Sequence, residues 1–213
     1  MKLERESNFE LLRIIAMFLV LVVHADYFSL GRPSFEEYTS YPLSSVTRIL
    51  IESISIVCVN VFVLISGWFG IHFKWRSLLN FLFQVFFFGV LIYAFCILFL
   101  KAPFNLKGIL ACFQITSWNW FVKSYLLLYL ISPVLNAFCE KASQKQFLTV
   151  LSGFFIFQTI YGFSGSAKFI EQGYSTMSFI GLYLLAQFVR NFVICKQKNT
   201  KLDESRFWGI LAA

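Results

Sequence analysis

Two ionisable residues within the first apolar stretch could do chemistry, Arg13 and His24. They are eleven positions apart, and at about 100° per residue this interval is three helical turns plus roughly 20°. Both side chains therefore fall on one face of a helix, about 16 Å apart along its axis. A guanidinium is permanently charged and binds phosphate, whereas a neutral imidazole accepts a proton near neutral pH. The pair predicts an anion clamp and a general base along one path.

A structural interpretation of the same two residues has equal support from geometry. Arg13 would extend to the lipid headgroups and pair with Glu10 one turn earlier, while His24 would lie at the interface beside Asp26. Ionisable groups inside a membrane helix are nevertheless costly, so each of them is a functional hypothesis. Spacing alone leaves both interpretations open.

The composition indicates that the surrounding elements lie in a membrane. Apolar residues make up 58% of the chain, aromatic residues 20% and charged residues 14%, against about 25% charged residues in soluble domains. With 28 Phe among 213 residues, the apolar surface must face lipid. The net charge of +7 is carried by short basic stretches between apolar runs, so we expect no nucleic-acid partner.

The predicted fold class is all-α, a polytopic transmembrane helix bundle. About six apolar stretches can cross a hydrocarbon core of about 30 Å, at residues 9–28, 46–71, 77–100, 120–139, 147–163 and 175–195. Residues 31–42, between the first two, have loop composition, and within the second stretch Glu52 is expected to pair with Arg48 one turn earlier. The run 106–115 is too short to span, and the sequence leaves open whether it lies at the interface or re-enters the membrane. Residues 207–213 look like the start of a seventh helix cut short. We therefore expect residues 1–213 to be one transmembrane domain, the N-terminal part of a longer one.

Lys and Arg residues predict the orientation. With the N-terminus in the cytoplasm, inner segments hold twelve of the 18 basic residues and outer segments hold six, as cytoplasmic loops require. The expected location is the cell (inner or plasma) membrane, with the first helix retained because no small-residue cleavage site follows it. The five cysteines include no Cys-x-x-Cys pair, so we expect no disulfide framework and no metal site.

Residues 8–17, Asn-Phe-Glu-Leu-Leu-Arg-Ile-Ile-Ala-Met, together with His24, resemble the opening helix of the acyltransferase-3 family of membrane enzymes. In that family ten residues separate an Arg from a His, as they separate Arg13 from His24. Two further stretches, 62–69 (Phe-Val-Leu-Ile-Ser-Gly-Trp-Phe) and 119–133, resemble the family in the same order.

The resemblance implies a protein of about ten helices that moves an acyl group from cytoplasmic acyl-CoA, such as acetyl-CoA, to a hydroxyl of an extracytoplasmic or lipid-linked glycan. It implies His24 as general base and Arg13, helped by Lys74 and Arg76, as the holder of CoA phosphates. The structural interpretation of Lys74 and Arg76 is that they are cytoplasmic anchors of the second helix. Where the family often has Arg-x-x-Arg, this chain has Lys74-Trp75-Arg76, which keeps the charge but only part of the bidentate fork. Trp120 would stack on a sugar, although aromatic residues are enriched at membrane interfaces in any case. Acyl-CoA is a substrate, and no cofactor is expected.

Two alternatives stay open. A small-molecule transporter would also place polar groups inside a bundle, but the sequence has no internal repeat and few acidic residues for ion coupling. A truncated family member that inserts and transfers nothing is the second. Acyl-CoA binding separates the transporter from the enzyme, and glycan acylation separates the enzyme from the inactive form.

Overall fold

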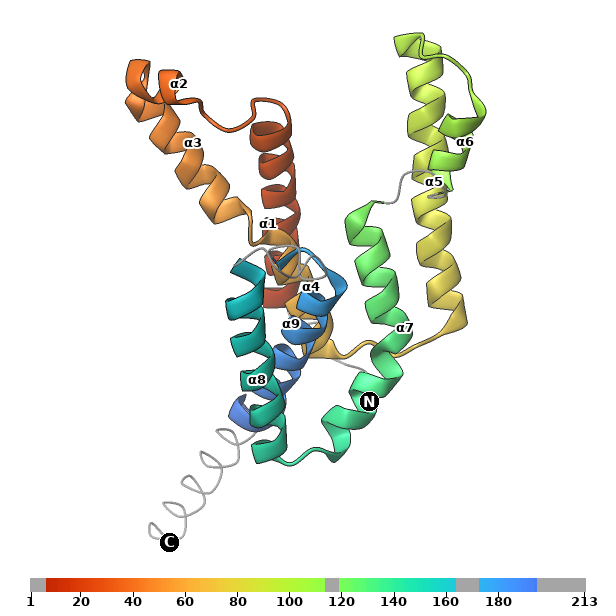
Figure 1. Ribbon diagram of the computed structural model, residues 1–213. Coiled ribbons are helices and arrows are strands. Elements are labelled where there is room, and N and C mark those ends of the chain that lie inside the picture. Colours follow the sequence, from red (N-terminus) through yellow and green to blue (C-terminus); the bar gives the residue numbers. More distant parts are fainter. Residues whose placement is uncertain (1–6, 114–118, 164–172, 195–213) are drawn as a thin grey trace, which may run out of the picture. The chain divides into compact units, whose positions relative to one another are not determined.

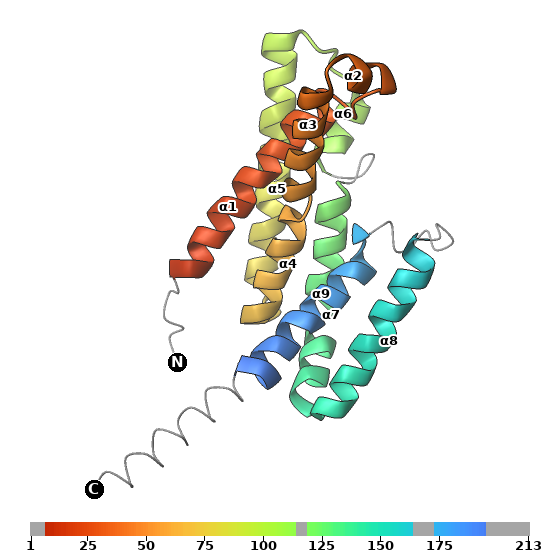
Figure 2. The ribbon, with the colours of Figure 1, turned by 90° about the vertical axis from the view of Figure 1, so that its left-hand side faces the viewer.

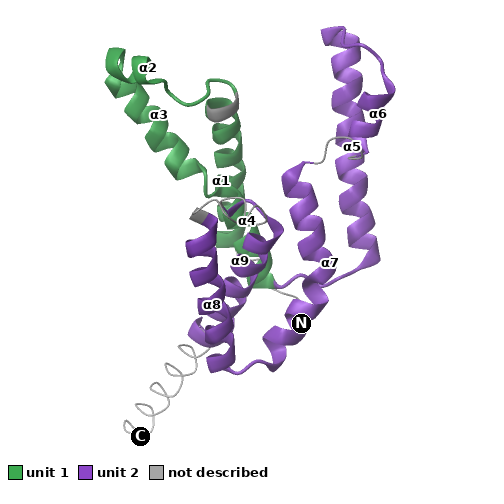
Figure 3. Ribbon diagram, in the orientation of Figure 1, with its two compact units in different colours: residues 1–69 green, residues 70–213 purple. Residues whose placement is uncertain are grey.

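The computed structural model describes residues 7–113, 119–163 and 173–194, and within these ranges every regular element is a helix. This confirms the all-α fold class. The chain divides into two compact units, Met1–Phe69 and Gly70–Ala213 (Figure 3). Each unit is described by itself.

From residue 7 onward, unit 1 contains four α-helices and one π-helix: α1 Ser7–Val23, η1 His24–Phe28, α2 Phe35–Ser40, α3 Pro42–Ser55 and α4 Cys58–Phe69. Helix α1 packs against both α3 and α4. Ala16 is its buried residue, 1% exposed, because a small side chain lets two helix backbones approach closely. Most of the larger apolar side chains of α1 face outward, as helices in lipid require.

The start of the second span differs from the sequence prediction. Residues between Gly31 and Pro42 were expected to form a loop, but α2 occupies part of them. A capping box starts this helix, because the Ser34 side chain accepts from the Glu37 N–H and the Glu37 carboxylate accepts from the Ser34 N–H. Helix α3 then begins with Pro42 in its first turn, and a turn at residues 56–57 divides the expected single helix into α3 and α4.

Unit 2 contains α5 Trp75–Leu100, α6 Leu106–Cys112, α7 Trp120–Lys141, α8 Gln144–Phe163 and α9 Thr176–Phe188, which continues as the π-helix η3 Val189–Ile194 (Figure 1). Helix α9 packs against α7 and α8, and Figure 2 shows α8 running alongside α9. The core between them is formed by Cys139, Phe147, Leu151 and Leu184.

Within the described residues, 5 helical segments are long and apolar enough to cross a membrane: Ser7–Asp26, Pro42–Phe69, Trp75–Leu100, Trp120–Lys141 and Thr176–Ile194. The sixth predicted span, 147–163, is helical as part of α8 but is not among them. Its polar residues lower the apolar character, since Gln144, Lys145 and Gln146 form its first turn and Gln158 lies near its end. The predicted start of a seventh helix, 207–213, lies outside the described residues.

The short helix α6 folds back along α5, whereas the placement of residues 106–115 at the interface or within the membrane stays a prediction. The Tyr93 hydroxyl accepts from the Asn105 N–H at 3.0 Å and contacts the Asn105 carbonyl oxygen at 3.1 Å. Further on, the Cys112 thiol lies 3.4 Å from the Gly89 carbonyl oxygen, and the Phe113 ring is 5.4 Å from that of Phe86. Phe86 precedes the end of α5 by fourteen residues, about 21 Å. The chain thus returns to about half the length of α5.

Candidate functional site

His24 is the first residue of the π-helix η1, where the chain leaves the regular α1 geometry. Such wide turns occur frequently at functional sites. The His24 side chain is exposed, and its Nδ1 lies 2.8 Å from the Val20 carbonyl oxygen. A carbonyl oxygen only accepts, so this contact places a hydrogen on Nδ1. In the neutral imidazole, Nε2 then carries the lone pair that can accept a proton.

Arg48 of α3 ties together the segments around η1. Its Nε donates to Asp26 Oδ1 at 3.2 Å, its Nη2 donates to the Gly31 carbonyl oxygen, and its Nη1 lies 3.8 Å from Glu37 Oε2. The Arg48 and Asp26 side chains are only 20% and 13% exposed, so solvent screens this ion pair less than a surface pair. The contacts connect α3 with η1, the following loop and α2.

The predicted pairing of Arg48 with Glu52 is wrong. We expected Glu52, one turn later in the same helix, to pair with it. Among the described residues its carboxylate partners are instead Asp26 and Glu37. Tertiary packing of α3 against η1 presents a nearer carboxylate than the helix itself does.

Arg13 lies in a different environment near the start of α1. Its Nη1 donates to Glu10 Oε1 at 2.8 Å, which confirms that predicted pair, and its guanidinium carbon lies 5.6 Å from the centre of the Phe69 ring. Both partners of the ion pair are about two fifths exposed (42% and 41%), and such pairs contribute only about 0–1 kcal/mol. An anionic ligand can therefore replace Glu10 at little cost.

Arg13 and His24 belong to opposite ends of unit 1. Near Arg13, the Phe9 ring lies 5.5 Å from Trp68 and 5.0 Å from Phe69, so the start of α1 adjoins the end of α4. The other end of α1 adjoins α3 through the ion pair of Asp26. Because an α-helix rises about 1.5 Å per residue, the eleven positions between these two candidate site residues correspond to about 16 Å along the axis.

The basic pair Lys74 and Arg76 lies at the N-terminus of α5 in unit 2, with both side chains exposed. Basic side chains at this end oppose the helix dipole, so they do not serve the stability of the helix. The backbone here is fixed by Tyr129, whose hydroxyl accepts from the Lys74 N–H at 2.9 Å. Two cations at the N-terminus of a helix favour the binding of phosphate.

Trp120, also in unit 2, is half-buried at the first position of α7. Its ring makes edge contacts with Tyr174 at 5.0 Å and Phe179 at 6.1 Å. These contacts give the residue a packing role between α7 and α9. Its predicted role of stacking on a sugar stays a prediction.

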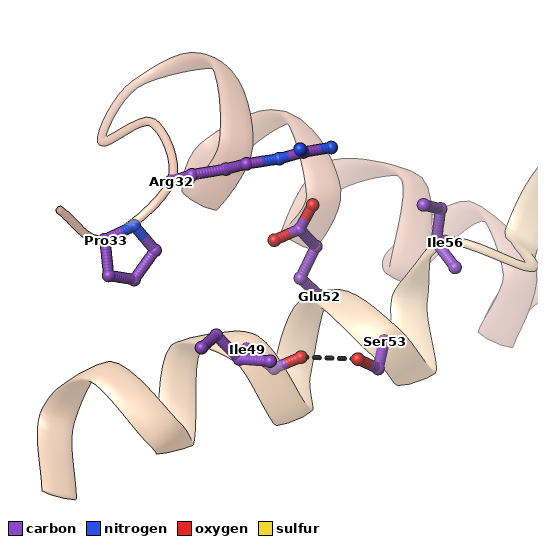
Figure 4. A pocket seen from close by; sticks show the side chains of 6 residues that line it. All are labelled: Arg32, Pro33, Ile49, Glu52, Ser53 and Ile56. Carbon is purple, nitrogen blue, oxygen red and sulfur yellow. Dashed lines mark hydrogen bonds between the residues drawn. The ribbon is translucent and has the colours of Figure 1, made fainter. Parts of the chain in front are cut away.

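A cavity of about 460 Å³ opens in unit 1, and we call it the α3 cavity (Figure 4). It is lined by Arg32, Pro33, Ile49, Glu52, Ser53 and Ile56. Sequence reasoning placed Arg32 among loop residues and Glu52 in a structural pair, and so missed this cavity. The readable signals were the Ser34-x-x-Glu37 capping pattern and Pro42, which fix the loop before α3.

The fold defines an integral membrane protein built from apolar helices. Its sequence matches the family model of acyltransferase-3, described as an acyltransferase domain, over residues 6–192. The chain therefore belongs to the acyltransferase-3 family, and this membership implies acyltransferase activity in general. No curated protein and no solved structure matches the chain.

Proposed function

We propose that this protein transfers an acetyl or other acyl group from cytoplasmic acyl-CoA to a hydroxyl of an extracytoplasmic or lipid-linked glycan. Family membership supports acyl transfer in general. The observation that carries the proposal is the environment of His24, an exposed imidazole on a membrane helix whose Nδ1 contacts a carbonyl oxygen. This tautomer presents Nε2 as a base.

In the proposed reaction, Nε2 of His24 accepts the proton of the acceptor hydroxyl. The hydroxyl oxygen attacks the thioester carbonyl carbon, a C–O bond forms, the C–S bond breaks, and the CoA thiolate leaves with the proton returned to it. The products are an acyl ester and free CoA. A positioned general base contributes about 10²–10⁴-fold to such a step, and the same base would serve a relayed transfer.

The donor would be held through its phosphates. With the N-terminus in the cytoplasm, as the basic residues predict, Arg13 faces the compartment that contains acyl-CoA. Its weak, half-exposed pair with Glu10 makes exchange for a phosphate inexpensive. Lys74 and Arg76 add two further cations at a helix N-terminus, and Trp120 would contact the sugar.

The test is ester formation in cells that lack their own copy of the gene. Cells expressing this chain should form acyl esters on surface glycan, and the His24→Ala variant should lose at least about 100-fold of the rate. His72→Ala is the matched control, because His72 is also exposed and contributes only its backbone oxygen to Tyr129. A chain that inserts and binds acyl-CoA but forms no ester would support the non-catalytic alternative.

A further inference from the structure

The α3 cavity combines polar and apolar surfaces in an arrangement suited to a small polyhydroxylated ligand. Figure 4 shows the Arg32 side chain extending over the Glu52 carboxylate, with Pro33 at one side and Ile56 at the other. Its volume of about 460 Å³ is within the range of ligand sites, about 300–1,000 Å³. Carboxylates accept hydrogen bonds from hydroxyls and guanidinium groups donate to them, while the aliphatic side chains can contact C–H faces.

Glu52 is the unexplained group of this cavity. It lies within the candidate span Pro42–Phe69 and is half-buried, where an ionisable side chain is costly and usually functional. No ion pair to its carboxylate is formed within the described residues. The neighbouring Ser53 hydroxyl already donates to the Ile49 carbonyl oxygen at 2.7 Å, which leaves its lone pairs to accept.

Side-chain contacts connect the α3 cavity to the segment that carries His24. One side of the cavity is formed by residues on one face of α3, and the other by the loop residues Arg32 and Pro33. Arg48 lies one turn before Glu52. Its guanidinium donates to the carbonyl oxygen of Gly31, the residue before Arg32, and to the carboxylate of Asp26, two residues after His24. The Arg48 guanidinium therefore holds α3, the loop before Arg32 and η1 in fixed positions relative to one another.

We propose that the α3 cavity binds a sugar unit of the acceptor, with Glu52 accepting hydrogen bonds from its hydroxyls. This inference rests on the proposed acyl transfer and adds the place and chemistry of acceptor recognition. Arg32 donates to the sugar oxygens, and Pro33, Ile49 and Ile56 contact its C–H faces. Glu52 is thus an acceptor-binding residue, distinct from the base His24.

The test compares Michaelis constants for the two substrates in membranes from cells lacking their own copy of the gene. The acceptor probe is the host's surface polysaccharide freed of esters by mild alkali, and the donor is radiolabelled acetyl-CoA. Glu52→Gln should raise KM for the polysaccharide by about tenfold to a hundredfold, because it removes hydrogen bonds to a charged acceptor. KM for acetyl-CoA should stay within about twofold of its original value.

Two further variants keep the test decisive. Ile49→Phe fills the cavity with an apolar side chain and should raise the same acceptor KM, even where Glu52→Gln does not accumulate in the membrane. Glu36→Gln is the matched control, since Glu36 is an exposed carboxylate of α2 outside the cavity. The inference is overturned if Glu52→Gln and Ile49→Phe leave the acceptor KM unchanged, or if Glu52→Gln lowers kcat alone.

Failure of the proposed function has a different signature. If the unaltered chain forms no ester, binding of oligosaccharides from the same polysaccharide to the purified protein is measured by saturation-transfer NMR. Loss of that signal in Glu52→Gln but not in Glu36→Gln supports the cavity without catalysis. Equal signals in both variants reject it.

Discussion

The Nε of Arg48 lies 3.2 Å from Oδ1 of Asp26, a residue 22 positions earlier in the chain. The contact joins the middle of α3 to the π-helix that begins with His24. It also explains why a charged residue is tolerated within a candidate membrane span, because the guanidinium is satisfied by a carboxylate and a backbone carbonyl oxygen.

We predict that Arg48→Met destabilises the protein by about 2–4 kcal/mol, because Asp26 then keeps a poorly solvated charge without its partner. Arg48→Lys should recover part of this loss, since a single ammonium cannot reproduce all three contacts. The measurement is thermal unfolding in detergent. Lys145→Met, which removes an exposed cation from α8, is the control, and an equal effect in both variants would contradict the structural role of Arg48.

His24 variants should separate the position of the base from its chemistry. His24→Asn can place its amide nitrogen where Nδ1 contacts the Val20 carbonyl oxygen, yet it supplies no base at the position of Nε2. We expect it to retain the unfolding temperature and to lose about 10²–10⁴-fold of kcat. Ester formation and unfolding are measured on the same preparation. Retention of more than a tenth of the rate would remove His24 from the proposed chemistry.

Gly181 of α9 and Gly153 of α8 together test how these two helices pack. A Cβ at Gly181 would overlap the Phe154 ring, whereas one at Gly153 meets nothing within 4 Å. Gly181→Ala should therefore destabilise the protein by about 1–3 kcal/mol through overpacking. Gly153→Ala should be neutral or stabilise by up to about 1 kcal/mol through helix propensity. Chemical denaturation in mixed micelles gives both values, and equal effects would show that the two helices do not pack as described.

The return of α6 along α5 predicts which positions reach water. On a cysteine-free background, a cysteine restored at 112 should react slowly with a membrane-impermeant maleimide, because Cys112 is buried against Gly89 at 6% exposure. With the N-terminus in the cytoplasm, as the basic residues predict, Ala102→Cys, just after the end of α5, should react rapidly from the outer face. Rapid labelling at both positions would place α6 at the membrane surface instead.

The basic pair Lys74 and Arg76 should determine the affinity for the acyl donor. Replacing both Lys74 and Arg76 by Gln should raise KM for acetyl-CoA by about tenfold, since each charged hydrogen bond to phosphate contributes about 1–3 kcal/mol before solvent screening. KM for the glycan should not change. The double replacement of Lys101 and Lys123, exposed residues of the same unit, is the control. An unchanged acetyl-CoA KM would remove the basic pair from the donor site.

The sequence by itself determined the protein class, the helical fold and most spans. Long apolar runs have one stable form in lipid, because a helix satisfies its backbone within the segment. The Arg13–Glu10 pair was also readable, since residues three apart on a helix are neighbours. The first apolar run likewise predicted one span that contains both Arg13, in α1, and His24, the first residue of η1.

Only the tertiary structure decided which distant residues meet. Arg48 was expected to pair within its own helix, but the approach of α3 to η1 gave it Asp26 and left Glu52 to line a cavity. The direction of α6 depended in the same way on two residues of α5. Gly89 has no Cβ and so lets the backbone of Cys112 approach, and the Tyr93 hydroxyl accepts from the Asn105 N–H. Hydrophobic periodicity reports which residues avoid water. In a membrane, an apolar side chain avoids water equally well against lipid or against another helix. The hydrophobic pattern therefore does not specify which helices pack together.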